Sequence, residues 1–376
     1  MRTLSDLGDV AGQRVFVRVD FNVPLEDGAI TDDTRIRAAL PTLRTLREQG
    51  ARLVLASHLG RPKGPDPELS LQPVRERLAE LLGEPVAFAE SLDAVPDDDV
   101  VLLENVRFHP GETKDDEGLA RRYAALADAY VDDAFGAAHR AHASTHAAAK
   151  LFERRAAGLL LEREVRTLLS ILSEPERPFV AVVGGAKVTD KIGVLERFLD
   201  VADEVLVGGA MAFPFLAAQG HDVGASLNAP EDAEPARRLL GHEKLRLPSD
   251  LVLGREFSAD TERRVLDGVD VPDGWMGLDI GPRTAEEYAD AVRGAATVFW
   301  NGPMGAFELE PFAAGTEAVA RAVAECRGTT VVGGGDSVAA ITKFGLQDEV
   351  THVSTGGGAS LELVEGKTLP GVEVLA

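Results

Sequence analysis

Basic, imidazole and short polar side chains gather at loop positions in the first half of the chain. Most of them follow a strand-like run and one opens a helix-like segment; the set comprises Asp20, Asn22, Arg35, His58, Arg61, Arg107 and Arg140. The planar fork of arginine binds phosphate or carboxylate through two parallel hydrogen bonds, so several arginines that face one point form an anion pocket. Asp20 and Asn22 could orient a hydroxyl group of the same ligand. Taken singly, each arginine could instead be a solvated loop residue, and Asp20 with Asn22 could simply form a turn.

Glycines end the strand-like runs of the second half. A glycine lets backbone N–H groups approach a phosphate, and the helix that follows adds a favourable dipole at its N-terminus. After Gly184-Gly185 come Lys187 and Lys191, whose spacing of four predicts that both lie on one face of a helix. Both ammonium groups could then reach a polyphosphate. The alternative is an ordinary helix start with surface lysines.

A further glycine turn, Gly334-Gly335-Asp336-Ser337, adds a carboxylate and a hydroxyl group. Asp336 could hold Mg²⁺ beside phosphate oxygens, because hard cations take carboxylate ligands. Asp and Ser are also good helix N-caps, which is the structural alternative. Asn301 and Glu308 could frame a ribose, although the Asn-Gly-Pro motif that starts at Asn301 is, by itself, more typical of a turn.

Several standard motifs are absent from the sequence. It contains no G-x-x-x-x-G-K-[ST] phosphate loop, no G-x-G-x-x-G/A dinucleotide fingerprint, no G-x-S-x-G elbow and no H-E-x-x-H zinc helix. The pair His139 and His142 has no common zinc spacing either, which disfavours a metal site there. A nucleotide site in this chain must therefore be of another type.

The elements that must position these residues alternate between strand-like and helix-like segments. In the first half, strand-like runs at 14–18, 52–56 and 100–103 alternate with helix-like segments at 35–49, 71–82 and 119–127. This order predicts a parallel sheet with helices on both faces, and such sheets bind ligands at the carboxyl ends of their strands. The second half repeats the pattern. The leucine-rich segment 158–172 predicts a helix that joins the halves stiffly, so that a hinge rather than a flexible tether links them.

Length and composition are those of a globular protein. A chain of 376 residues suggests two domains, and 45% hydrophobic residues supply enough core to exclude disorder as the main state. The formal charge is 39 − 62 = −23, so the surface repels nucleic-acid backbones, and any anionic ligand needs a local basic patch.

The sequence also bears on the cellular compartment. The single Cys326 excludes an internal disulfide and fits a reducing environment. The start, Met1-Arg2-Thr3-Leu4-Ser5-Asp6, lacks the apolar core of a signal peptide. The longest nearly apolar stretch, 205–218, is interrupted by Gly208, Gly209 and Pro214 and is too short for a membrane span. We expect a cytoplasmic protein with neither a membrane nor a nucleic acid as its partner.

Taken together, the motifs resemble the phosphoglycerate kinase family from Arg14 to the end of the chain. The motifs that carry the resemblance are Arg18-Val-Asp-Phe-Asn-Val-Pro24, Ser57-His-Leu-Gly-Arg-Pro62, Leu103-Glu-Asn-Val-Arg-Phe108, Asp133-Ala-Phe-Gly136, His139-Arg-Ala-His142, Gly184-Gly-Ala-Lys-Val188, Trp300-Asn-Gly-Pro303, Gly333-Gly-Gly-Asp336 and Ser354-Thr-Gly-Gly-Gly-Ala-Ser360. Departures are few: Ser337 stands where threonine is frequent, Thr189 where serine is frequent, and Ala147 where glycine is common.

The resemblance implies an α/β fold with two Rossmann-like domains. Each would be a parallel sheet with helices on both faces, and the two would be separated by a cleft and joined by an interdomain helix. The implied divisions are 1–157 for an N-terminal domain that binds 3-phosphoglycerate or 1,3-bisphosphoglycerate, 158–174 for the interdomain helix, 175–360 for a nucleotide-binding domain, and 361–376 for a tail that returns to the N-terminal domain.

The resemblance also implies a role for each site residue. Substrate-binding positions fall on Asp20, Asn22, Arg35, His58, Arg61, Arg107 and Arg140. Nucleotide-binding positions fall on Lys187, Lys191, Gly277, Asn301, Glu308, Gly334, Gly335, Asp336 and Ser337. Arg35, Lys187 and Lys191 would be catalytic, and Asp336 would hold Mg²⁺.

The implied reaction is the reversible transfer of the acyl phosphate of 1,3-bisphosphoglycerate to ADP, with Mg²⁺, by a monomeric enzyme. Two other readings compete with it. A non-catalytic protein could sense phosphorylated metabolites through the basic pocket, but it would have no need of Lys187, Lys191 and Asp336. A two-domain oxidoreductase would need the dinucleotide fingerprint that the sequence lacks.

Overall fold

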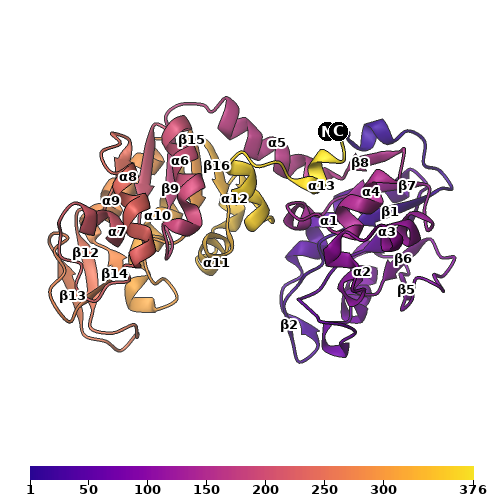
Figure 1. Cartoon of the computed structure of the whole chain (residues 1–376), viewed down its shortest axis with the longest axis horizontal. Coiled ribbons are helices and arrows are strands. Elements are labelled where there is room, and N and C mark those ends of the chain that lie inside the picture. Colours follow the sequence, from indigo (N-terminus) through magenta and orange to yellow (C-terminus); the bar gives the residue numbers. More distant parts are fainter. The chain divides into compact units, whose positions relative to one another are not determined.

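The computed structural model describes residues 1–376 and divides the chain into two compact units (Figure 1). Unit 1 consists of Met1–Arg166 together with Lys367–Ala376, and unit 2 consists of Thr167–Gly366. Each unit is built on a six-stranded parallel sheet with helices on both faces, as predicted. No helix in the chain combines the length and the apolarity that crossing a bilayer requires.

The sheet of unit 1 has the strand order β5-β6-β4-β1-β7-β8. Its strands are β1 (Arg14–Arg18), β4 (Arg52–Ala56), β5 (Ala87–Ala89), β6 (Val100–Leu103), β7 (Ala129–Asp132) and β8 (Arg155–Ala157). The central strands are buried and rich in valine and leucine, as expected for parallel strands that are covered on both faces. From β1 the chain moves to β4 on one side and reaches β7 on the other, so the strand order changes direction between β1 and β7, the position at which such sheets commonly bind ligands.

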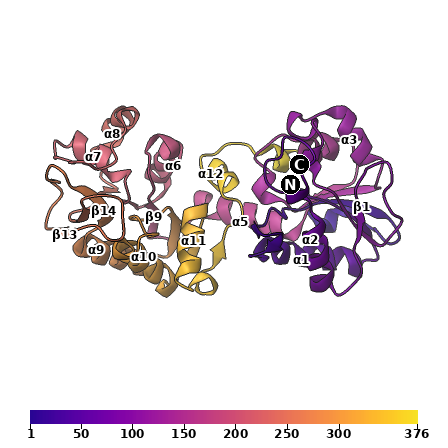
Figure 2. The same cartoon turned by 90° about the horizontal axis from the view of Figure 1, so that it is seen from below.

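The helices of unit 1 cover both faces of this sheet. They are α1 (Thr34–Glu48), α2 (Gln72–Leu82), α3 (Glu117–Ala124), α4 (Ala148–Lys150) and α13 (Pro370–Glu373). Figure 2 shows α1 and α2 on one face and α3 on the other. The helix α2 has Pro73 in its first turn and ends at Gly83, whose φ of 76° only glycine adopts readily. A small hairpin, β2 (Leu25–Glu26) with β3 (Ala29–Ile30), follows β1.

The sheet of unit 2 has the strand order β11-β10-β9-β15-β16-β17. Its strands are β9 (Phe179–Val183), β10 (Glu204–Val207), β11 (Leu245–Arg246), β15 (Thr297–Asn301), β16 (Thr329–Val332) and β17 (His352–Val353). A separate antiparallel sheet in the order β13-β12-β14 is formed by β12 (Leu251–Gly254), β13 (Arg263–Leu266) and β14 (Met276–Ile280). This second sheet was not predicted from the sequence.

The helices of unit 2 lie on both faces of its parallel sheet. They are α6 (Ile192–Val201), α7 (Ala212–Ala218), α8 (Ala233–Leu239), α9 (Pro282–Arg293), α10 (Ala314–Glu325), α11 (Gly335–Lys343) and α12 (Gly358–Val364). Figure 2 shows α6 to α8 on one face and α9 to α11 on the other. In this arrangement each glycine turn leads from a strand end toward a helix start.

The remaining segments are the long helix α5 and the C-terminal tail. The helix α5 spans Leu159–Ser173, and its residues are shared by the two units. Within unit 1 the tail lies beside the N-terminus, where the backbone N–H of Arg2 donates to the carbonyl oxygen of Leu375 at 2.7 Å (Figure 1). The N–H of Gly371 donates to the carbonyl oxygen of Ala138 at 2.9 Å, which ties α13 to the loop after β7.

Candidate functional sites

Five segments of unit 1 bring the predicted anion-binding residues to the carboxyl edge of its sheet. Asp20 and Asn22 follow β1, His58 and Arg61 follow β4, Arg107 follows β6, Arg140 follows β7, and Arg35 lies in the first turn of α1. Parallel strands end at the same edge of a sheet, so these loops meet although their residues are far apart in the sequence.

Asp20 and Arg35 form an ion pair within this edge. Arg35 Nη1 lies 2.8 Å from Asp20 Oδ2, and the backbone N–H of Asn22 donates to Asp20 Oδ1 at 3.2 Å. Burial alone would raise the pKa of Asp20, but the positive charges of Arg35 and Arg18 and the backbone N–H of Asn22 help to lower it below its usual value. Asp20 is therefore an ionised acceptor, and Arg35 keeps N–H groups that the pair does not use.

Asn22 and Arg107 connect three of these loops through Gly60. Asn22 Oδ1 accepts the backbone N–H of Gly60 at 2.8 Å, and Arg107 Nη1 donates to the Gly60 carbonyl at 2.6 Å. Gly60 has φ 62°, and a Cβ there would lie 2.8 Å from Leu69 Cδ2, so this junction requires glycine. The side-chain amide N–H groups of Asn22 remain available to a ligand.

His58 is buried beside two arginines. Its Nδ1 lies 3.1 Å from Arg18 Nη2. Burial lowers its pKa to about 3; Asp20 opposes this shift, and the positive charges of Arg18 and Arg107 add to it. The ring is consequently neutral at physiological pH.

Three arginines of this edge keep unused donor groups. Arg61 and Arg140 are exposed, and their guanidinium groups make no hydrogen bond or ion pair within the chain. The Nε of Arg107 is buried without a partner, and burial together with the charge of Arg18 lowers the Arg107 pKa. Arg140 acts electrostatically on His142, whose pKa burial and the arginine charges lower to about 4. Positive charge therefore converges here with few carboxylates to neutralise it.

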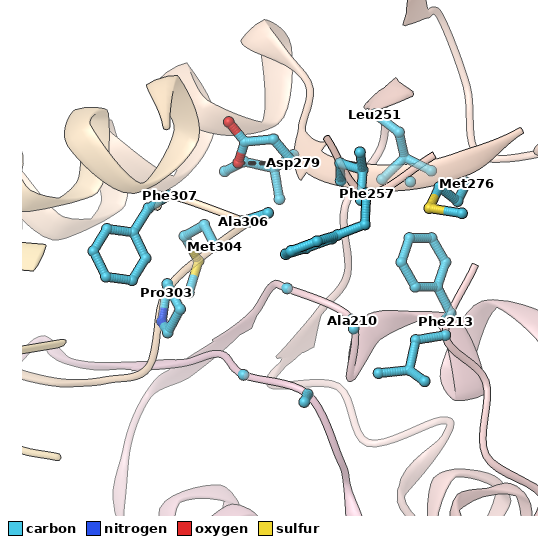
Figure 3. A pocket seen from close by; sticks show the side chains of 18 of the residues that line it. Ala210, Phe213, Leu251, Phe257, Met276, Asp279, Pro303, Met304, Ala306 and Phe307 are labelled. Carbon is cyan, nitrogen blue, oxygen red and sulfur yellow. Dashed lines mark hydrogen bonds between the residues drawn. The ribbon is translucent and has the colours of Figure 1, made fainter. Parts of the chain in front are cut away.

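A pocket of about 750 Å³ opens in unit 2 at the carboxyl end of its sheet (Figure 3). One wall carries Phe213, Leu251, Phe257 and Met276, and the opposite wall is the loop from Pro303 to Glu308. The glycines at 185, 209 and 277 line it with bare backbone. A flat aromatic or heteroaromatic group fits such walls.

Three of the predicted nucleotide residues, Gly277, Glu308 and Asp336, line this pocket. A Cβ at Gly277 would lie 2.2 Å from Phe213 Cζ, so this position requires glycine while Phe213 keeps its place. Glu308 and Asp336 are exposed, and neither carboxylate makes a hydrogen bond or ion pair in the chain. Both are free to meet a ligand.

Lys191 lies at the glycine turn after β9. Its Nζ donates to the carbonyl oxygens of Gly184 at 2.5 Å and of Asn301 at 3.3 Å. Burial lowers the pKa of Lys191 to about 8, although the Asp336 and Asp190 charges oppose this shift. A desolvated ammonium group is thus held at the ends of two neighbouring strands.

The prediction that Lys187 and Lys191 share one helix face is wrong. The helix α6 begins only at Ile192, after a short 3₁₀ turn at Thr189–Lys191. The backbone N–H of Thr189 donates to Asp232 Oδ1 at 2.7 Å, so a side chain outside the helix accepts the first N–H of this turn. Lys187 is half-exposed in the preceding loop, and its Nζ lies 3.3 Å from Glu231 Oε1.

Asn301 and Ser337 bind backbone groups of the two glycine turns. Asn301 Nδ2 donates to the Gly333 carbonyl at 2.6 Å, and the Ser337 hydroxyl donates to the same oxygen at 2.9 Å while it accepts the N–H of Gly302. Gly334 has φ 91°, and a Cβ there would lie 2.3 Å from Asn301 Nδ2. Asn301 Oδ1 is buried and has no partner, so it could still accept a hydrogen bond.

The fit to a divalent cation rests on Asp336. Its carboxylate is exposed and unpaired in the first turn of α11. The chain holds no group of three or more His, Cys, Asp or Glu side chains arranged to bind a metal. An Mg²⁺ ion at Asp336 would therefore take its other ligands from phosphate oxygens and water, as Mg²⁺ commonly does at nucleotides.

Asp279 and the aromatic walls of the pocket were not predicted from the sequence. Asp279 lines the pocket (Figure 3) and is buried. Its two oxygens accept the backbone N–H groups of Ile280 at 2.9 Å and Gly315 at 2.7 Å. Burial raises its pKa to about 8, against these hydrogen bonds. Asp279 thereby ties β14 to α10. The only sequence signal was a lone acid in an apolar run.

The chain is similar to known proteins over its full length. The family described as "Phosphoglycerate kinase" matches residues 4–367. A phosphoglycerate kinase of Rubrobacter xylanophilus is 55% identical over 388 residues, covering 100% of this chain and 98% of the relative. One of Moorella thermoacetica is 54% identical, covering 99% and 98%.

Solved structures show the same likeness. The structure of phosphoglycerate kinase from Coxiella burnetii matches with a TM-score of 0.91 at 42% identity, covering 99% of this chain and 98% of that one. The Pyrococcus horikoshii phosphoglycerate kinase matches with a TM-score of 0.84 at 33% identity, covering 100% and 98%.

Proposed function

The chain belongs to the phosphoglycerate kinase family, and from this premise we propose how its residues divide the work of the reaction. The enzyme is a phosphotransferase with a carboxyl group as acceptor. It transfers the acyl phosphate of 1,3-bisphosphoglycerate to ADP, reversibly, giving 3-phosphoglycerate and ATP in glycolysis. Its substrates are small molecules.

Unit 1 is the proposed site of the phosphoglycerate. Arg61, Arg107 and Arg140 would hold the phosphate that is not transferred, because each has N–H donors that no group of the chain uses. The Asp20 carboxylate and the Asn22 amide would bind the 2-hydroxyl as acceptor and donor. The single observation that carries this assignment is the convergence of unpaired guanidinium groups in a chain of net charge −23.

Unit 2 is the proposed site of the nucleotide. The apolar pocket lined by Phe213, Phe257 and Met276 would take the base, and Glu308 would accept from the ribose hydroxyls. Glycine turns at 184–185 and 334–335 would give backbone N–H groups to the phosphates. When bound, Mg²⁺ would neutralise phosphate charge, and Asp336 would hold it.

The transfer itself needs positioning and charge neutralisation more than covalent help. A terminal oxygen of ADP attacks the acyl phosphorus, the bond from phosphorus to the carboxyl oxygen breaks, and the carboxylate leaves with the electron pair. Arg35 and Lys191 would contact the equatorial oxygens of the phosphoryl group in transit, and Lys187 would balance charge on the nucleotide phosphates. With a pKa of about 8, Lys191 is mostly protonated at neutral pH.

Two ligands on separate units must still meet for reaction. The reacting oxygen and phosphorus have to come within about 3–3.5 Å. We therefore propose that the units move about a hinge at α5 and at the 354–355 segment. This movement would also exclude water from the reaction. We further propose that the enzyme works as a cytoplasmic monomer.

A coupled assay with 3-phosphoglycerate and Mg-ATP tests the proposed function. We expect 1,3-bisphosphoglycerate to form only when both substrates and Mg²⁺ are present. Binding of both ligands without turnover would instead identify a metabolite-sensing protein. Failure to bind 3-phosphoglycerate would refute the assignment of unit 1.

A further inference from the structure

Arg18, at the end of β1, is buried and commits each of its three nitrogen groups to a different acceptor. Its Nε donates to Ser144 Oγ at 2.8 Å, its Nη1 donates to the carbonyl oxygen of Val19, and its Nη2 faces His58 Nδ1 at 3.1 Å. Only 1% of this side chain is exposed, so no ligand can reach it. Arg18 must therefore act through its neighbours.

The contact between Arg18 and His58 has only one chemically consistent protonation state. A guanidinium group has N–H donors and no acceptor, so His58 Nδ1 must offer its lone pair. The ring proton of a neutral imidazole then sits on Nε2. A proton on Nδ1 would set two donors against each other at 3.1 Å.

A buried carboxylate holds Arg18 in this orientation. The Ser144 hydroxyl accepts from Arg18 Nε, so its own proton goes to Glu112 Oε1, at 2.5 Å. Glu112 is fully buried and also accepts from the backbone N–H of Ser144 at 3.2 Å. Burial raises the pKa of Glu112, while the charge of Arg18 and the Ser144 bonds lower it. The chain of side-chain contacts from Glu112 through Ser144 and Arg18 to His58 thus joins four separate segments of unit 1.

We propose that Arg18 is a positioning residue that fixes His58 as the neutral tautomer carrying its proton on Nε2, so that His58 serves phosphoglycerate as a hydrogen-bond donor and not as a cation. The proposal rests on the proposed function of unit 1. It makes the charge of the pocket come from arginines alone, and it keeps the contribution of His58 constant over the physiological pH range.

The charged groups that face His58 are consistent with this state. Arg18, Arg35 and Arg107 approach it from β1, α1 and the loop after β6, and Asp20 approaches from the loop after β1. Three positive charges against one negative charge disfavour an imidazolium ion. The phosphate of a ligand would meet a neutral N–H instead.

Nitrogen NMR of the histidine rings in the ligand-free, full-length protein tests the tautomer directly. The His58 signals are assigned by their loss in His58→Asn. We expect an unprotonated Nδ1 and a protonated Nε2 that do not change between about pH 5.5 and pH 8, around the ordinary histidine pKa near 6.5. A proton on Nδ1, or an imidazolium ion at pH 7, would overturn the proposal. This readout does not involve phosphoglycerate, so it is independent of the proposed function.

Two substitutions test whether Arg18 is the cause. Arg18→Lys keeps a positive charge beside Glu112 but presents no planar fork, and Ser144→Ala removes the relay while it keeps Arg18. In Arg18→Lys, burial still keeps the His58 ring neutral, but we expect part of its proton to move to Nδ1, with KM for 3-phosphoglycerate raised about three- to tenfold, the effect of one hydrogen bond. Ser144→Ala should show a smaller change of the same kind.

The control is Arg37→Lys, the same substitution at an exposed arginine of α1 that pairs with Asp33. It should leave the His58 signals and KM unchanged. If Arg18→Lys leaves the tautomer and KM as in the wild type, Arg18 does not fix His58. If only kcat and stability change, Arg18 has a structural role alone.

Discussion

Replacing Lys191 by methionine separates a catalytic from a structural role for this residue. Its pKa falls from 10.5 to about 8 because the ammonium group is buried. The pKa difference is about 2.5 units, and each unit corresponds to about 1.4 kcal/mol. At neutral pH the buried charge therefore lowers the free energy of unfolding by about 3 kcal/mol. The cost is present below pH 8 and is relieved as pH rises from 8 to 10.5, where the unfolded chain alone keeps the proton.

Methionine has a similar length and no charge, so it removes this cost. It also leaves the Gly184 carbonyl without the donor it had at 2.5 Å, which costs about 1–3 kcal/mol. The two effects partly cancel. We therefore expect the variant to have a free energy of unfolding equal to that of the wild type or up to about 2 kcal/mol higher. Turnover should fall about 10²–10³-fold, the effect of one preorganised donor to the phosphoryl group.

The measurements are urea unfolding and the coupled assay at saturating substrates. Lys244→Met is the matched control, because Lys244 Nζ also holds two carbonyl oxygens, of Leu199 at 2.8 Å and of Asp200 at 3.3 Å, away from the pocket. It should lose some stability and keep its turnover. If Lys191→Met unfolds more easily by over about 3 kcal/mol, or keeps turnover within about threefold, the reasoning about Lys191 fails.

Three further expectations concern the two pockets. Arg35→Ala should reduce turnover by about 10²-fold or more while nucleotide affinity, measured by calorimetry, stays nearly intact; turnover within about threefold of wild type would remove Arg35 from the transition state. Asp336→Ala should weaken binding of Mg-ADP but not of 3-phosphoglycerate, and unchanged Mg-ADP titrations would show that Asp336 does not hold the metal. The kcat/KM for ATP should decline as pH rises through about 8, where free Lys191 loses its proton, and a flat profile to about pH 9.5 would contradict the shifted pKa of Lys191.

The meeting of the predicted anion-binding residues at one edge of the unit 1 sheet was predictable because it depends on strand ends. Asp20, His58 and Arg107 each follow a strand of the same parallel sheet, and the strand-like runs at 14–18, 52–56 and 100–103 coincide with β1, β4 and β6 within a residue. Once the strands are parallel, their carboxyl ends must share an edge. Sequence spacing is sufficient for this kind of inference.

The network behind this pocket could not be predicted in the same way. Arg18 ends a strand like any surface arginine, and Glu112 and Ser144 lie 94 and 126 residues further on. Their meeting depends on how α3 and the segment after β7 pack under the sheet. Burial, which no single sequence position reveals, converts these polar residues into one hydrogen-bonded unit.

The pocket of unit 2 shows a different limit. Its aromatic wall comes from α7 and from the antiparallel sheet β12–β14, whose strands carry neither glycine turns nor charged motifs to mark them. The lysine pair shows the limit of periodicity: a spacing of four implies one helix face only if the helix has already begun. Here α6 begins at Ile192, one residue after Lys191.

A net charge of −23 is compatible with the binding of phosphorylated substrates if the ligand meets a few unpaired arginines at short range. Most other arginines of the chain are paired with carboxylates. Arg47, Arg77 and Arg293 each bridge two carboxylates on the surface, and such pairs contribute little field beyond a Debye length of about 8 Å at physiological salt. Arg61 and Arg140 have no such partner, and Arg107 keeps a buried free donor. Long-range attraction is therefore weak, and in the proposed site recognition would depend on short-range, geometrically fixed donors. A neutral His58 among them would add a directional hydrogen-bond donor without adding positive charge. The site would then complement the shape of its ligand as well as the ligand's negative charge.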